Sequence, residues 1–154
     1  MATDEDWDAY GRAVIDIAPP GRAPFRLVPD RPGTTDGWPE GLVSPVVVVT
    51  AWDPDSVRLQ PDDNWARHQR LVSELDRSGL LHWPAVGRDP DAAHHEEGLA
   101  VAGLTESEGV DLGRRHGQAA VYVWTPEAWT VVSCTDDRRH TYGWRVTDRP
   151  APSG

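Results

Sequence analysis

Val46-Val47-Val48-Val49-Thr50-Ala51-Trp52 is the stretch of sequence that decides the predicted fold. β-Branched side chains fit the pleated surface of a sheet, and this run is apolar at successive positions. It therefore predicts a central strand that is buried on both faces. Asp53 and Pro54 follow directly and end the strand.

The residues after this strand carry alternating helix and strand signals. Apolar residues at helical spacing predict a helix over 62–78, and Gly79 is the expected stop. Thr105 and Glu108 form a capping box, which predicts a second helix over 105–115. Apolar and β-branched runs predict further strands over 80–86, 98–103, 119–124, 129–134 and 142–146.

The order β-α-β-β-α-β over residues 46–124 predicts an α+β fold with a ferredoxin-like split β-α-β core. Its first and third strands are expected to lie parallel at the centre, flanked by the fourth and the second. The strand over 129–134 would extend the sheet as a C-terminal hairpin. Both helices would cover one face of the sheet.

The central strands are apolar on both faces, so the second face of this sheet also needs a cover. Three candidates follow from the sequence. An N-terminal helix is predicted over 4–17, because Trp7, Tyr10 and Val14 share one helical face. A long Gly- and Pro-rich surface loop is predicted over 29–45, after a short strand over 25–28. The third candidate is a second subunit in a homodimer.

Length and composition indicate a single domain over 1–147. A chain of 154 residues has the size of one domain. Residues 148–154 are polar and Pro-rich, which predicts a disordered tail. The start of the chain has no basic and apolar signal-peptide pattern, and the lone Cys134 forms no intrachain disulfide. A cytoplasmic location is therefore expected.

The charge balance makes several partners and chemistries unexpected. A formal net charge of −10 repels nucleic acid and anionic membranes, so we expect neither as a partner. All 15 basic residues are arginine, which rules out Schiff-base lysine chemistry and a P-loop lysine. The eight tryptophans are expected mainly in the core, where an indole buries a large apolar area.

Several short motifs in the centre of the chain resemble a known family. They are Thr50-Ala51-Trp52-Asp53-Pro54, Asn64 with Leu71 and Leu75, Pro84 to Asp91, Glu97-Gly98, and Gly117-Gln118-Ala119-Ala120-Val121. In this order they resemble the bacterial family called domain of unknown function 3293, over about residues 44–124. The family's first motif has Asn before Pro, whereas this chain has Asp53. The resemblance supports the domain assignment and implies no activity.

His94-His95-Glu96-Glu97 is the densest group of side chains able to bind a metal. Neighbouring residues on a strand point to opposite faces, so at most two of these four converge. A metal site would need a third ligand such as His116. The alternative is a solvated loop that meets a strand. We predict no metal and no cofactor, with His94 and His95 as the weak candidates.

Polar residues at the strand and helix junctions are the other candidates for a site. Glu97 and His116 are the candidate acid–base pair, with Arg88 or Gln118 stabilising negative charge. The candidate ligand-binding residues are Arg88, Glu97, Gln118, Asn64 and Asp53. In the predicted core, Asp53 and Asn64 lie at one edge of the sheet. The remaining candidates, His94 and His95 among them, lie at the opposite edge.

Three functions fit this sequence. The favoured one is a binding module for a small polar ligand or a protein. The second is an enzyme that uses Glu97 and His116, with a metal-assisted version through His94 or His95. The third is an acidic neutraliser, similar to an immunity protein or antitoxin, that covers a basic partner.

Overall fold

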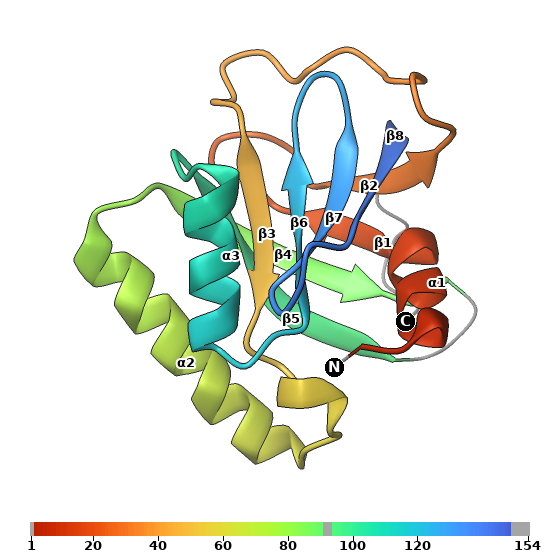
Figure 1. Ribbon diagram of the computed structural model, residues 1–154. Helices are drawn as coiled ribbons and strands as arrows, with labels where there is room; N and C mark the ends of the chain where they lie inside the picture. The colour runs from red at the N-terminus through yellow and green to blue at the C-terminus, as the bar shows by residue number, and fades with distance from the viewer. Residues whose placement is uncertain (1, 91–93, 149–154) are drawn as a thin grey trace, which may run out of the picture.

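The computed structural model describes residues 2–90 and 94–148. These residues form three α-helices, one short 3₁₀-helix and eight strands (Figure 1). The elements are α1 (Asp4–Arg12), β1 (Val14–Ile17), β2 (Phe25–Asp30), β3 (Val46–Thr50), η1 (Pro54–Ser56), α2 (Pro61–Ser78), β4 (His82–Arg88), β5 (His95–Ala102), α3 (Glu106–Arg115), β6 (Ala120–Trp124), β7 (Trp129–Ser133) and β8 (Arg139–Asp148).

The strands form a closed antiparallel barrel in the order β1-β2-β8-β7-β6-β3-β5-β4. The prediction of an open, ferredoxin-like sheet is therefore wrong. Four strands are neighbours in the expected order, β6-β3-β5-β4, but β3 and β5 run antiparallel rather than parallel. Val46 pairs with Ala102 and Thr50 with Gly98, so the end of β3 lies beside the beginning of β5.

The barrel closes because residues 14–17 form a strand instead of continuing the N-terminal helix. α1 ends at Arg12, and β1 then pairs with both β2 and β4. The predicted helix over 4–17 is thus wrong for residues 13–17. Asp16 interrupts the apolar pattern of β1, and ion pairs with Arg26 and Arg88 hold it at 3% exposure on the outside of the barrel.

The inner faces of the strands form a core inside the barrel. Val46 and Val48 point into it, and the second face of the sheet is therefore covered by the sheet itself. One end of the barrel is filled by large aromatic side chains, and Trp38 from the loop after β2 packs on Trp124 with ring centroids 4.3 Å apart. The buried tryptophans of this core are Trp83, Trp124, Trp129 and Trp144.

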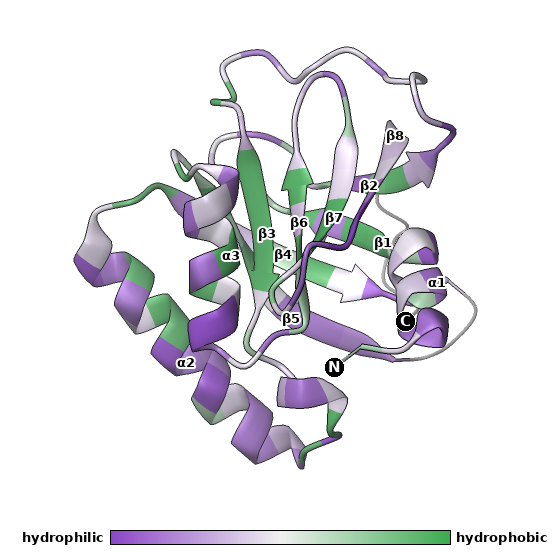
Figure 2. Ribbon diagram, in the orientation of Figure 1, coloured by the Kyte–Doolittle hydropathy of each residue, from purple (hydrophilic) through white to green (hydrophobic). Residues whose placement is uncertain are grey.

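A second core lies between the outside of the barrel and two helices. Val47 and Val49 of β3 pack there against Leu71 and Leu75 of α2 and Leu112 of α3. In Figure 2, β3 is hydrophobic over most of its length, whereas α2 is largely hydrophilic. The predicted helices over 62–78 and 105–115 are confirmed.

The N-terminal helix covers the end of the barrel opposite the tryptophans. The buried Trp7 packs against His140 of β8, and the Tyr122 hydroxyl donates a hydrogen bond to the Tyr10 carbonyl at 3.2 Å. α1 thus takes part in covering the interior, although at a barrel end rather than on a sheet face. Residues 149–154 of the predicted tail lie outside the described residues. Within the described part of the chain, no helix combines the length and apolar character needed to cross a membrane.

Gly98 is required by the close packing of three strands. A Cβ atom at this position would lie 2.6 Å from the Val49 carbonyl oxygen and 3.3 Å from that of Ala85. We expect Gly98→Ala to lower the free energy of unfolding by about 1–3 kcal/mol, because backbone atoms of neighbouring strands cannot move away easily. Urea denaturation followed by tryptophan fluorescence measures this change.

Gly37→Ala is the matched control for this substitution. A Cβ atom there meets no atom within 4 Å, and Gly37 is exposed. Its effect should stay within about 0.5 kcal/mol. A Gly98→Ala protein as stable as the Gly37→Ala protein would contradict the described strand packing.

Candidate functional site

A pocket of about 400 Å³ opens at the end of the barrel that α1 covers. Small side chains create it: Ala13, Gly87 and Ala120 stand where the other end of the barrel carries indoles. This volume lies within the range of small-molecule sites, roughly 300–1,000 Å³. Its polar and charged lining residues are Asp6, Tyr10, Thr50, Asp53, Ser56, Arg58, Arg88, Asp89, His94, Glu96 and Gln118.

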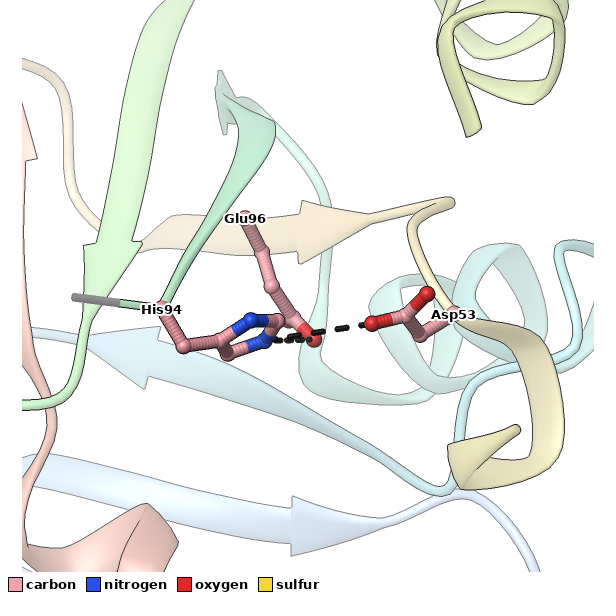
Figure 3. A group of neighbouring side chains, drawn as sticks. All are labelled: Asp53, His94 and Glu96. Atoms are coloured by element: carbon pink, nitrogen blue, oxygen red, sulfur yellow. Dashed lines mark ion pairs between the residues drawn. The ribbon is translucent and has the colours of Figure 1, made fainter. Parts of the chain in front are cut away.

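Asp53, His94 and Glu96 converge at this pocket. His94 Nε2 lies 3.5 Å from Glu96 Oε1 and 3.8 Å from an Asp53 carboxylate oxygen, Oδ2. Figure 3 shows the imidazole pointing towards both carboxylates. Among the described residues, this is the group of metal-binding side chains whose ligand atoms all lie within 4.8 Å of one another. Two carboxylates and an imidazole form a donor set that suits a transition-metal ion.

Strand geometry brings these three residues together. His94 directly precedes β5 and Glu96 is the second residue of the strand, so both lie on the face that Ala100 and Ala102 turn to the inside of the barrel. Asp53 follows the end of β3, and the antiparallel pairing of β3 with β5 places that end beside Gly98. A parallel pairing, as predicted from the sequence, would have separated Asp53 from Glu96 by the length of the sheet.

Asn64 fixes the orientation of the Asp53 side chain. The Asn64 Oδ1 atom accepts a hydrogen bond from the Asp53 backbone N–H, and its Nδ2 donates to Asp53 Oδ1, both at 2.8 Å. The backbone N–H of Leu59 also donates to Asp53 Oδ1 at 2.9 Å. Because Oδ1 accepts both of these hydrogen bonds, the other carboxylate oxygen, Oδ2, faces His94.

The turn after β3 is conformationally strained. Asp53, Asp55 and Ser56 have φ angles of 43°, 55° and 60°, although none of them is glycine. Non-glycine residues adopt positive φ infrequently and at an energetic cost, and such residues cluster at functional sites.

Burial and the neighbouring Asp53 carboxylate raise the pKa of Glu96 to about 7, while Arg58 acts in the opposite direction. The Glu96 side chain is 35% exposed and lines the pocket. Near neutral pH, Glu96 is therefore divided between its protonated and ionised forms. It is able to donate as well as accept hydrogen bonds in the pocket.

Gln118 and Arg88 are predicted ligand-binding residues that do line the pocket. Gln118 Nε2 donates to the carbonyls of Trp52, at 3.1 Å, and His116, at 3.3 Å. Arg88 Nε donates to Asp16 Oδ2 at 2.8 Å. Burial alone would raise the pKa of Asp16, but the hydrogen bonds from Arg26 and Arg88 outweigh it and lower that pKa.

The predicted acid–base pair, Glu97 and His116, is not brought together. Glu97 carries the opposite orientation to Glu96 on β5, and its carboxylate lies 3.9 Å from His95 Nε2. His116 lies at the end of α3, and its imidazole is 3.3 Å from a carboxylate oxygen of Glu74 on α2. Burial lowers the pKa of His116, and Glu74 opposes this effect. Neither residue lines the pocket beside α1.

Sequence reasoning named Glu96 only within the metal-capable group of residues 94–97, and it missed Tyr10, Ser56 and Arg58 as pocket residues. Glu96 had a usable signal, because it shares a strand face with His94. The choice between the pair His94 and Glu96 and the pair His95 and Glu97 requires knowing which face points into the barrel. Tyr10, Ser56 and Arg58 reach the pocket through α1 and the turn after β3, and no local pattern in the sequence marks them.

Fold and site together define a small closed β-barrel with two helices packed on one side and a polar pocket at one end. Residues 49–121 match the family model described as protein of unknown function (DUF3293). The resemblance to this family is thereby confirmed, and the matched stretch contains Asp53, Asn64, His94 and Glu96. No curated protein and no solved structure matches this chain.

Asn64→Ala tests the contacts that position Asp53. Asn64 is 2% exposed, and its loss leaves the Asp53 N–H and carboxylate without two hydrogen bonds. We expect the free energy of unfolding to fall by about 1–3 kcal/mol, measured by urea denaturation. Gln69→Ala, at an exposed position of the same helix, should change it by less than about 0.5 kcal/mol. Equal effects in both variants would refute the positioning role.

Glu96→Gln tests the electrostatics of the pocket. The pKa of Glu96 rises on folding from 4.5 to about 7, so the folded state binds a proton more tightly than the unfolded state. Wild-type stability therefore falls as the pH rises through this interval, and a glutamine avoids that loss. We expect Glu96→Gln to gain about 1–2 kcal/mol over wild type between pH 5 and pH 8, less than the full shift implies, because water in the pocket screens the charge.

Urea denaturation at a series of pH values measures this gain. Asp53, Arg58 and His94 face Glu96 and stay unchanged in the variant. Glu97→Gln makes the same chemical change on the outward face of β5. Identical pH dependence in the two variants would be inconsistent with the assignment to Glu96.

Proposed function

We propose that this protein is a binding module and that its ligand occupies the pocket beside α1. The observation that supports this proposal is the convergence of several polar side chains on one cavity of about 400 Å³. A cavity with a partly apolar wall and a few directed polar groups is typical of a small-molecule site. Here Ile15 and Tyr122 supply apolar wall, and Asp53, His94 and Glu96 supply the polar groups.

The charges in the lining favour a ligand that carries amino or hydroxyl groups. The acidic residues Asp6, Asp53, Asp89 and Glu96 line the cavity, whereas its basic lining residues are Arg58 and Arg88, and Arg88 is paired with Asp16. Carboxylates accept hydrogen bonds and attract positive charge, and a ligand with donors or a cationic group complements them. The net charge of −10 acts in the same direction.

Strain in the turn after β3 is a second argument for a ligand site at this position. The three residues with positive φ angles lie beside the pocket, and hydrogen bonds to Asn64 of α2 and to the Gly117 carbonyl hold the turn there. A protein without a function at this turn would gain stability from glycine or asparagine at these positions. We therefore infer that the unfavourable backbone conformation of this turn is kept because the turn places Asp53 at the pocket.

Ala120→Trp tests this proposal by filling the pocket. Ala120 lines the cavity, so an indole there occupies the space of the ligand. We expect a compound from a panel of amino acids, amino sugars and small amines to raise the Tm of the wild type and not that of Ala120→Trp. Ligand at about 100 times its Kd stabilises the fold by about 2.7 kcal/mol, which corresponds to several degrees.

Ala66→Trp is the matched control, because Ala66 is exposed on α2 and does not line the pocket. It should retain the full Tm increase seen with the wild type. Differential scanning fluorimetry in metal-free buffer provides the measurement, and isothermal titration calorimetry provides the affinity. A compound that stabilises Ala120→Trp as strongly as wild type would place the ligand elsewhere.

A further inference from the structure

We propose that Asp53, His94 and Glu96 bind one divalent transition-metal ion at the floor of this pocket. The inference deepens the proposed binding function, since the metal would form part of the surface that the ligand contacts. It rests on the geometry of the three ligand atoms, on the contacts that hold Asp53, and on the cavity in front of them.

The distances between the side chains already approach those around a bound ion. With metal–ligand bonds of about 2.0–2.2 Å, two ligand atoms on a tetrahedral ion lie about 3.3–3.6 Å apart. His94 Nε2 lies 3.5 Å from Glu96 Oε1 and 3.8 Å from Asp53 Oδ2. Shifts of a few tenths of an ångström therefore complete the two distances to His94, and the ligand atoms of Asp53 and Glu96 lie within 4.8 Å of each other. Figure 3 shows that the three side chains reach the same point from two different strand ends.

The ligand atom of Asp53 is positioned before any ion binds. Oδ1 accepts hydrogen bonds from Asn64 Nδ2 and from the Leu59 N–H, which orients Oδ2 towards His94. Metal-binding carboxylates are commonly held by such outer contacts. Asn64 is itself buried on α2, so the packing of that helix fixes the position of the ligand atom.

Electrostatics favour a cation at this point. The Asp53 and Glu96 carboxylates lie close enough to repel each other, and a divalent ion between them replaces that repulsion by two attractions. Arg58 also lines the pocket, but its side chain belongs to an exposed residue of the turn. The local charge is therefore best balanced by an ion held among the three side chains.

The donor set selects the class of metal. Calcium and magnesium prefer oxygen ligands throughout, whereas an imidazole nitrogen with two carboxylates suits zinc, iron, cobalt or manganese. Three protein ligands leave at least one coordination position open, which is the arrangement of sites that bind a further molecule. That open position faces the cavity of about 400 Å³.

Alternation along β5 supplies matched controls for an experiment. His94 and His95 are neighbours, as are Glu96 and Glu97, but in each pair one residue lines the pocket and the other does not. His94→Ala and Glu96→Gln therefore remove proposed ligands. His95→Ala and Glu97→Gln make the same changes on the outside of the barrel.

The full chain, stripped of metal with a chelator, is titrated with Co²⁺, Zn²⁺ and Ca²⁺ by calorimetry, and Co²⁺ binding is also followed by its visible absorption. We expect one Co²⁺ per chain, displaced by Zn²⁺, with much weaker binding of Ca²⁺. His94→Ala and Glu96→Gln should weaken Co²⁺ binding at least as much as the roughly 10–100-fold typical of losing an outer contact. The His95 and Glu97 variants should bind as the wild type does.

Three outcomes would overturn the proposal: no saturable binding of Co²⁺ or Zn²⁺, equal losses in the pocket and control variants, or Ca²⁺ binding as tight as Co²⁺ binding. Circular dichroism of each variant verifies that it is folded. The metal and the organic ligand are tested separately. If the metal-free wild type binds a panel compound and Ala120→Trp does not, but no variant binds Co²⁺ specifically, then the proposed function stands and the metal site is refuted. If the chain binds Co²⁺ specifically and no panel compound binds, the metal site stands and the proposed organic ligand is refuted.

Discussion

The pairing of β1 with both β2 and β4 closes the sheet, and the rest of the structure depends on this closure. Ile15 lies opposite Leu27 on one side and Gly87 on the other. Without β1, the strand order would end at β4 and β2, and both would expose unpaired backbone groups. Closure gives every strand two neighbours and turns one sheet face into an interior. The other face of β3, β5 and β6 is then available for α2 and α3.

The size of the inward side chains divides the barrel into a filled end and an open end. Trp83, Trp124, Trp129 and Trp144 occupy one end of the interior, and Trp38 packs against them from the loop after β2. At the other end, alanine and glycine side chains leave space that polar groups line. A barrel of eight strands has an interior just wide enough for side chains to fill or for one small ligand to occupy. This chain shows both solutions in the same barrel.

Local sequence patterns predicted most of the elements but not their closure. The capping box at Thr105 and the Val-rich run of β3 depend on neighbouring residues, and such signals are readable from one sequence. The sequence did not predict β1 because Val14 continues the helical spacing of Trp7 and Tyr10. In addition, the charged Asp16 interrupts the short apolar run that would indicate a strand. Of the two arginines that pair with the buried Asp16, Arg26 lies on the next strand, but Arg88 lies 72 residues away along the chain.

Local patterns also predicted the residues of the site better than their arrangement in space. Asp53, Asn64 and His94 were candidates, but the parallel arrangement expected for β3 and β5 assigned Asp53 and His94 to opposite edges. The antiparallel register brings His94 Nε2 to 3.8 Å from Asp53 Oδ2. The sequence analysis chose Glu97 rather than Glu96 and so chose the wrong face of β5. Neighbouring residues of a strand lie on opposite faces, so an error of one residue moves the predicted side chain to the other side of the sheet.

The position of Asp53 shows how the stability of this fold is connected to its pocket. A left-handed backbone at a residue other than glycine is locally unfavourable, so contacts from elsewhere must hold it. Those contacts come from Asn64, whose helix is anchored on the barrel by Leu71 and Leu75. The apolar surface that α2 buries against the barrel therefore also stabilises the strained turn that contains Asp53. Because Asp53 Oδ1 is satisfied by this support, Oδ2 is directed at the pocket by the same packing that folds the protein.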